Sequence, residues 1–227
     1  MSPVLWAIPL VIIGLILGGL LFLHVRKLGE QRTKKFTDFA EQMGMEFSVE
    51  DEWDIGESLS AFDLFWEADI TNVLSGDSEQ LGYGEEFEVT VLECAHDDGG
   101  DTRVHQTVIY FRSPQLNLPK FQLRPEEWHH KIGSKLGYQD IDFESHPTAA
   151  EFSKKYLLRG KDEQKIRALF TDPALTFFAA HPDEVSVEGS DDQLIWYQPK
   201  KTVEPEDIPA FMKEGFEVFR VFARKQN

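Results

Sequence analysis

The densest cluster of side chains with chemical potential is three carboxylates and an imidazole, which alternate with apolar residues in QDIDFESHP (residues 139–147). In an extended strand, alternate side chains project from one face, and carboxylate oxygens with an imidazole on one face can hold a divalent cation. The stretch lacks the glycine and the ligand spacing of an EF-hand, and any half-buried strand shows the same alternation. The alternative is therefore structural, with these side chains capping turns or pairing with Arg159. The candidate metal ligands are Asp140, Asp142, Glu144 and His146.

A second candidate metal site is a thiol with two imidazoles in the stretch from Phe87 to Ser113, which reads as a β-hairpin. With Gly99-Gly100 as a two-residue loop, Ala95 pairs with Val104, and one face of the hairpin becomes apolar. The other face then carries Cys94, His96 and His105, which are ligand types that zinc accepts. A register slip of one residue would separate these side chains, leaving a buried thiol beside surface histidines.

Other kinds of functional site find little support in the sequence. A G-x-S-x-G nucleophile elbow is absent, and LGYGEE (residues 81–86) is acidic and precedes a predicted strand, unlike a phosphate-binding loop. A formal charge of −17 argues against nucleic-acid binding, which needs lysine and arginine to displace counterions. A single cysteine excludes a disulfide scaffold. No catalytic constellation is recognised, which favours a protein that is not an enzyme.

Residues 4–23 (VLWAIPLVIIGLILGGLLFL) form twenty consecutive positions without a charged side chain. A helix of that length spans roughly 30 Å, the hydrocarbon thickness of a bilayer, so we predict a transmembrane helix that contacts the lipid bilayer directly. A cleaved secretory signal is the alternative, but a basic n-region and an A-x-A site are missing. Residues 24–35 form a basic juxtamembrane collar, which by the positive-inside rule predicts a single-pass inner-membrane protein with its N-terminus outside and its C-terminal domain in the cytoplasm.

Within this segment, Gly14 and Gly18 form a G-x-x-x-G pattern. Small residues at this spacing let two helices approach closely, so a homodimer through this face is one expectation. Glycine is also common in membrane helices without any such role.

Residues 36–227 carry 18 basic against 39 acidic side chains, a net charge of −21, and show the pattern of one acidic α+β domain. We expect an antiparallel sheet backed by helices, and a long amphipathic helix at the end of the chain. Residues 33–43 are expected to form a first helix that ends at Gly44. Residues 46–60 are expected to form a surface loop in which Trp53 packs inward, and Trp66 is expected in the core. Strands are expected within 61–76, 87–113, 121–128, 156–160 and 184–198, and helices within 162–170, 172–181 and 205–224.

At FQLRPEEW, at residues 137–170 and at EVSVEGSDDQLIWY, the chain resembles a family of uncharacterised bacterial single-pass membrane proteins. The resemblance implies an N-terminal anchor followed by a domain of unknown function, and it assigns no catalytic or binding residues. Two functions follow as hypotheses. The first is a scaffold or binding module for an unknown protein partner, and the second is a membrane-tethered metal-dependent enzyme or metal sensor that uses the cluster from Asp140 to His146.

Overall fold

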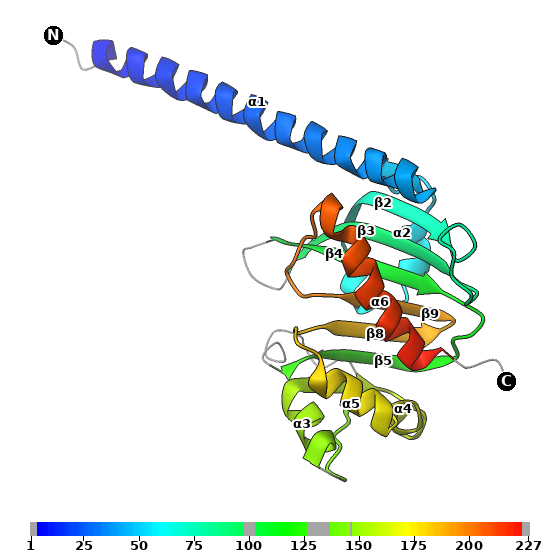
Figure 1. Cartoon of the computed structure of the whole chain (residues 1–227). Helices are drawn as coiled ribbons and strands as arrows, with labels where there is room; N and C mark the ends of the chain where they lie inside the picture. Colours follow the sequence, from blue (N-terminus) through cyan, green and yellow to red (C-terminus); the bar gives the residue numbers. More distant parts are fainter. Residues whose placement is uncertain (1–3, 98–102, 127–136, 146, 224–227) are drawn as a thin grey trace.

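The structure is a computed structural model that describes residues 4–97, 103–126, 137–145 and 147–223, apart from the side chains of residues 4–12 and 14. It begins with one continuous helix, α1 (Val4–Met43), which stands away from the rest of the chain (Figure 1). The predicted helix over 33–43 is the last part of α1, where Phe36 and Ala40 are buried against the sheet. Gly44 ends it with φ +68°, a left-handed conformation that glycine adopts without strain.

Nine strands form a single sheet in which every neighbouring pair is antiparallel, as the alternating sequence patterns predict. The spatial order is β1-β2-β3-β4-β9-β8-β5-β7-β6, so the hairpin β8–β9 lies between strands that precede it in sequence. The strands are β1 (Glu46–Glu50), β2 (Asp69–Asp77), β3 (Glu88–Asp97), β4 (Arg103–Arg112), β5 (Leu118–Pro125), β6 (Gln139–Asp140), β7 (Tyr156–Gly160), β8 (Ser186–Asp191) and β9 (Gln193–Tyr197).

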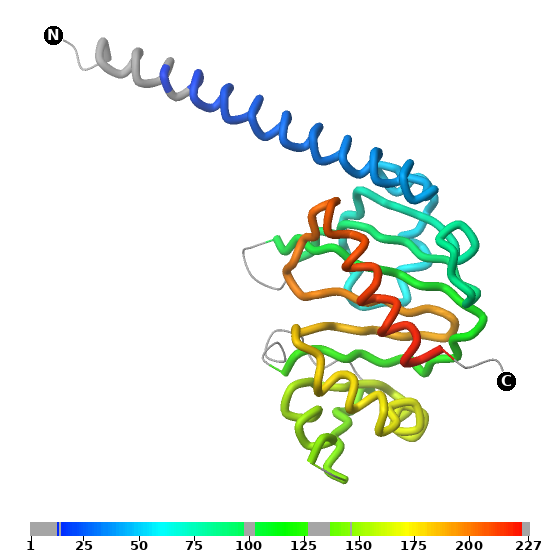
Figure 2. The backbone as a smooth tube through the Cα atoms, in the orientation of Figure 1, coloured from blue at the N-terminus to red at the C-terminus, as the bar shows by residue number. Residues whose placement is uncertain are grey.

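One side of the sheet, which we call the helix face, is covered by helices. The final helix α6 (Ile208–Phe222) crosses it, and Gly215 lets the helix backbone approach Ile109 and Trp196 closely (Figure 2). Smaller helices cover the β5 and β7 end: α3 (Pro147–Lys155), α4 (Glu163–Leu169) and α5 (Asp172–Ala180). A short 3-10 turn, η3 (Pro205–Asp207), precedes α6. The aromatic side chains concentrate here, including Phe87, Phe111, Phe121, Phe152, Phe170, Phe178, Phe216 and Phe219.

The other side, the cover face, is protected by one connection, residues 51–68, which we call the cover segment. It contains α2 (Ile55–Leu59) and the 3-10 turn η1 (Asp63–Phe65), and it lies behind the sheet in Figure 1. Leu59 and Phe62 from this segment pack against Leu92 and Val108 of the sheet. A second, smaller core is therefore enclosed by a segment with little regular structure.

The α+β class, the antiparallel sheet and the C-terminal helix are confirmed, whereas several local predictions are wrong. The predicted loop over 46–60 contains β1 and α2, and α3 was not foreseen. Trp53 is 38% exposed and Trp66 is 77% exposed, so neither belongs to the core. The helix predicted within 162–170 is confirmed, and Asp162 caps it, because its carboxylate accepts a hydrogen bond from the Lys165 backbone N–H at the start of α4.

Over the part of the chain that the structure describes, no helix is long and apolar enough to cross a membrane. The finding contradicts the transmembrane helix predicted over 4–23 and the single-pass inner-membrane location and orientation that depend on it. The predicted homodimer contact involves Gly14 and Gly18. The surroundings of Gly14 lie outside what the structure describes, and Gly18 has open space around it.

Candidate functional site

The register of the sheet aligns four polar or aromatic side chains into a row on the cover face. Glu46 of β1 pairs with Ser75 of β2, Ser75 with Thr90 of β3, and Thr90 with Tyr110 of β4. Directly paired side chains on adjacent strands lie about 5 Å apart, so the row is continuous across four strands. Thr90 and Tyr110 are both buried although they are polar.

A second row runs parallel to the first, two residues further along each strand. Asp77 of β2 pairs with Glu88 of β3, and Glu88 with Arg112 of β4. Asp77 is held by a reciprocal pair of hydrogen bonds with Gln80, at 3.0 and 2.8 Å, whereas Arg112 donates from Nε to Asp192 at 3.1 Å. The two rows place three carboxylates and one guanidinium around a patch of sheet.

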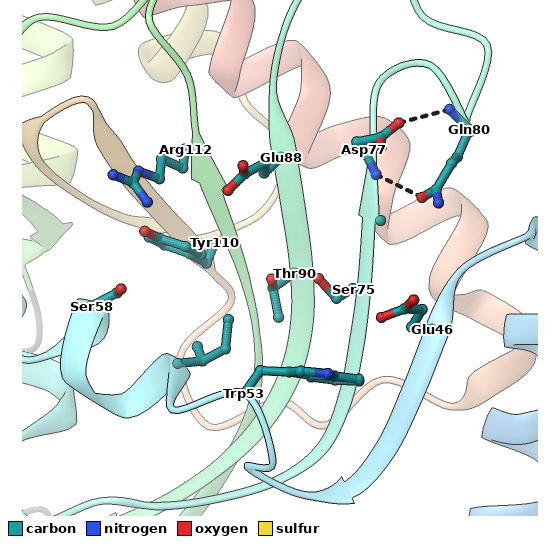
Figure 3. Close-up of a pocket in the computed structure, with 12 residues that line it drawn as sticks. Glu46, Trp53, Ser58, Ser75, Asp77, Gln80, Glu88, Thr90, Tyr110 and Arg112 are labelled. Atoms are coloured by element: carbon teal, nitrogen blue, oxygen red, sulfur yellow. Dashed lines mark hydrogen bonds between the residues drawn. The ribbon is translucent and has the colours of Figure 1, made fainter.

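The cover segment leaves the two rows partly open and forms a hollow of about 420 Å³ with them. Trp53 lies beside Thr90 and Ser75, and Ser58 lies on the side of Tyr110 (Figure 3). Asp51 fixes this part of the segment, because its two carboxylate oxygens accept hydrogen bonds from the backbone N–H groups of Ile55 and Gly56, each at 2.8 Å. The aromatic side of the hollow is thus held by a capped helix turn.

The electrostatics of the hollow are unbalanced. Glu46 and Glu88 are exposed and have no ion pair or hydrogen bond among the described residues. The only guanidinium among the described lining residues, that of Arg112, already faces Asp192. With three carboxylates against this one cation, the lining carries a net charge of −2.

Tyr110 adds a buried polar atom to the hollow. The residue is 4% exposed, and its hydroxyl has no hydrogen-bond partner at bonding distance in the described part of the chain. Burial raises the pKa of Tyr110 to about 12, although the neighbouring Arg112 and the Ser58 hydroxyl lower it. The phenol is therefore neutral at physiological pH and able to donate a hydrogen bond.

A buried polar network holds the other end of the cover segment. The Gln122 side-chain amide donates to Asp63 of η1 at 2.5 Å and to Glu188 at 3.1 Å. Glu188 also accepts from Arg124 at 2.9 Å and from the Tyr197 hydroxyl at 3.2 Å. Burial lowers the pKa of Arg124, but the neighbouring Tyr197 and Glu188 outweigh it, so the net direction is upward. The Arg124–Glu188 ion pair lies within the sheet and leaves the Arg124 Nε without a hydrogen-bond partner among the described residues, whereas the hydrogen bond from Gln122 to Asp63 connects the cover segment to the sheet.

Arg32 joins α1 to the sheet body. Its guanidinium donates hydrogen bonds to two carboxylates, and we call this set of contacts the Arg32 joint. Glu93 accepts one bond from Nε at 3.2 Å and one from a terminal nitrogen, and Glu204 accepts one at 2.9 Å. A further bond reaches the Val203 carbonyl at 2.8 Å, and Asn72 donates to the second oxygen of Glu93 at 2.6 Å. Arg32 thereby links the helix to β3 and to the segment before α6, beside the ion pair of Lys35 with Glu206 and the buried Phe36.

The described carboxylates of the predicted carboxylate and histidine cluster do not gather around a common point. Asp140 pairs with Arg159 at 2.5 Å, as the structural alternative predicts, and the Asp142 carbonyl accepts from Arg167. Glu144 is exposed, and His146 lies outside the described residues. Among the side chains that the structure describes, no three of the histidine, cysteine, aspartate and glutamate type come together around a common point.

The thiol and imidazole cluster is separated by a register slip of one residue. Ala95 pairs with His105 instead of Val104, so Cys94 faces Gln106, and His105 projects from the helix face while Cys94 and His96 project from the cover face. Burial raises the pKa of Cys94 to about 12, so the thiol is protonated and a poor ligand or nucleophile.

Sequence reasoning missed the hollow because its rows depend on pairing between strands far apart in the chain. A signal was present in β3 and β4, where Glu88, Thr90, Tyr110 and Arg112 alternate with the apolar residues Val89, Val91, Ile109 and Phe111. Such positions mark a face that is not wholly packed.

Comparisons with known proteins bear on the fold alone. No family model matches the sequence, and no curated protein matches it. Among solved structures, the chain is similar to the crystal structure of the mycobacterial trehalose monomycolate transport factor A, TtfA, with a TM-score of 0.55 and 14% identity. The match covers 84% of this chain and 91% of that chain. The resemblance to uncharacterised single-pass proteins stays a prediction, whereas a solved structure has a similar overall fold.

Proposed function

We propose that this protein is a partner-binding scaffold, in which α1 and the sheet body contact separate surfaces and are held at a fixed distance and angle. The single observation that carries the proposal is the Arg32 joint. The Arg32 side chain, which is 24% exposed, donates four hydrogen bonds that connect α1 to the sheet body. We interpret this connection as a device that fixes the orientation of the helix for its function.

Two surfaces offer contacts on either side of the joint. The described part of α1 exposes large apolar side chains from Ile13 to Leu28, and Trp66 on the cover segment is exposed in the same way. Exposed large apolar residues are common contact points for partners. The name of the structural neighbour, a transport factor, is compatible with a role of this kind, in which a protein assists a process by holding components together.

The experiment places a photoreactive amino acid at Leu20 on α1, at Trp66 on the sheet body, or at both positions of one molecule. The crosslinked adducts that each variant forms are then measured in cells. A flexible seven-residue Gly-Ser linker is inserted between Gly29 and Glu30, where the helix is exposed and Gly29 has open space. A matched control inserts an alanine-rich helical segment of about two turns at the same point, which preserves rigidity.

A scaffold predicts discrete adducts at both positions and a doubly adducted species. The flexible linker should lower the yield of that species at least about fivefold while each single adduct persists, because linked sites gain from a fixed geometry. The helical control should stay within about twofold of the unmodified chain. Equal yields with both insertions, or a position that forms no adduct, would overturn the proposal.

A further inference from the structure

The hollow on the cover face has an excess of negative charge that the described residues do not neutralise. Glu46 and Glu88 form no ion pair or side-chain hydrogen bond in the described part of the chain, and Arg112, which attracts Glu88 from the neighbouring strand, is ion-paired with Asp192. A neutral ligand would take these carboxylates out of water without compensating them, whereas a cation would form charge-assisted hydrogen bonds with both.

The hollow also offers two features that are independent of its carboxylates. The Tyr110 hydroxyl is buried, lines the hollow and lacks a partner at bonding distance among the described residues, so a ligand group can satisfy it. Trp53 presents part of its indole ring to solvent at the same hollow (Figure 3). A guanidinium or ammonium over an indole face is attracted by the negative face of the ring.

The spacing of Glu46 and Glu88 excludes one small ion bound to both. Glu46 and Glu88 belong to β1 and β3, two strand spacings or roughly 10 Å apart across the sheet. Metal–oxygen bonds are about 2.0–2.6 Å, so one ion cannot reach both. Two basic side chains on one extended or turned peptide can reach both.

We propose that the hollow binds a basic segment of a partner protein, with lysine or arginine side chains meeting Glu88 and Glu46 and one of them lying against Trp53. The net charge of −21 over residues 36–227 favours approach of such a segment. This inference deepens the proposed scaffold by naming the chemistry of one partner. The two can fail separately, because the linker experiment does not depend on the hollow.

The test uses the full chain and a fluorescein-labelled peptide, acetyl-Gly-Arg-Gly-Gly-Arg-Gly-amide, followed by anisotropy at low and moderate salt. A peptide with citrulline in place of both arginines is the neutral isostere, and trehalose is the carbohydrate probe. Saturable binding of the arginine peptide is expected, with the citrulline peptide and trehalose at least about tenfold weaker.

Matched variants separate the hollow from general attraction to an acidic protein. Glu46→Gln/Glu88→Gln should weaken binding at least about tenfold, whereas Asp142→Asn/Glu144→Gln, which removes the same charge from an exposed site elsewhere, should change it less than about twofold. Trp53→Ala should weaken binding about threefold or more, with Trp66→Ala as its control. The glutamate, aspartate and tryptophan positions changed in these variants are all exposed. Tyr110→Phe, which keeps the buried ring and removes the hydroxyl, should weaken binding about twofold.

Equal losses in the two double variants, or equal binding of the citrulline peptide, would overturn the proposal. Saturable binding of trehalose that depends on Trp53, with none for the arginine peptide, would assign the hollow to a carbohydrate instead.

Discussion

Replacing Arg32 by alanine tests whether the joint between α1 and the sheet is a strong interaction or a surface contact. Burial lowers the pKa of Arg32, but its hydrogen bonds and charge interactions with Glu93 and Glu204 outweigh it and raise the pKa overall. Alanine is the best helix former, so the substitution leaves the intrinsic propensity of α1 intact. The change in stability therefore reports on the joint.

The magnitude follows from the burial of each partner. The Glu93 side chain is 14% exposed, so its charged hydrogen bonds with Arg32 are expected to contribute about 1.5–3 kcal/mol, and the variant leaves this carboxylate with only Asn72. The Glu204 side chain is 60% exposed and adds about 0.5 kcal/mol. We expect Arg32→Ala to lower the free energy of unfolding by about 3 kcal/mol, or about 150-fold in the equilibrium constant.

The assay is urea unfolding of the full chain followed by circular dichroism, with Arg26→Ala as the control. Arg26 pairs with Glu30 on the same helix at 2.9 Å, but both side chains are more than 60% exposed, so its loss should cost at most about 0.5 kcal/mol. Arg32→Ala combined with Glu93→Gln should show a coupling energy of about 1 kcal/mol or more. If Arg32→Ala costs no more than Arg26→Ala, or if the two substitutions are additive, the joint is not the interaction that fixes α1.

Two further predictions concern the interior of the sheet body. The Cys94 thiol should resist a thiol reagent at pH 8 in the folded protein and react rapidly in denaturant. Because its pKa is raised from 9.0 to about 12, it contributes stability that is fully present below pH 9 and is lost as pH rises through 12. Urea titrations at successive pH values should show that Cys94→Ala removes part of this loss of stability at alkaline pH. Gly160→Ala should lower thermal stability by about 2–3 kcal/mol at the transition, because the new Cβ would lie 2.1 Å from Ile166 Cδ1 and 2.7 Å from the Lys120 carbonyl oxygen. Gly84 has open space around it, so Gly84→Ala should change stability by less than about 0.5 kcal/mol. Equal melting temperatures for the two variants would contradict the close approach at Gly160.

The elements that sequence reasoning found are those stabilised by local patterns. The helix α6 presents buried residues such as Ile208, Phe211 and Phe219 at helical spacing, and α4 begins at an aspartate that caps it. These signals lie within one or two turns of chain and need no knowledge of the partner surface.

The elements that were missed acquire their structure from partners far along the chain. The strand β1 is a five-residue edge strand whose Phe47 packs against Phe36 of α1, with ring centroids 5.7 Å apart. The helix α2 has five residues and depends on Asp51 as its cap. Elements this short have too few residues to show a period, so tertiary contacts decide their conformation.

The candidate site and the failed zinc prediction have the same cause, the register of the β3–β4 hairpin. The closing pair Asp97 with Arg103 leaves five residues between the strands instead of a two-residue loop. In the predicted register Tyr110 pairs with Val89 on the helix face, whereas the observed register pairs it with Thr90 and turns it to the cover face. A shift of one residue in register therefore separates Cys94 from His105 and at the same time brings Tyr110 to the hollow. A site on a sheet face can be predicted only when the turn that sets the register is known, because a slip of one residue exchanges the two faces of a strand.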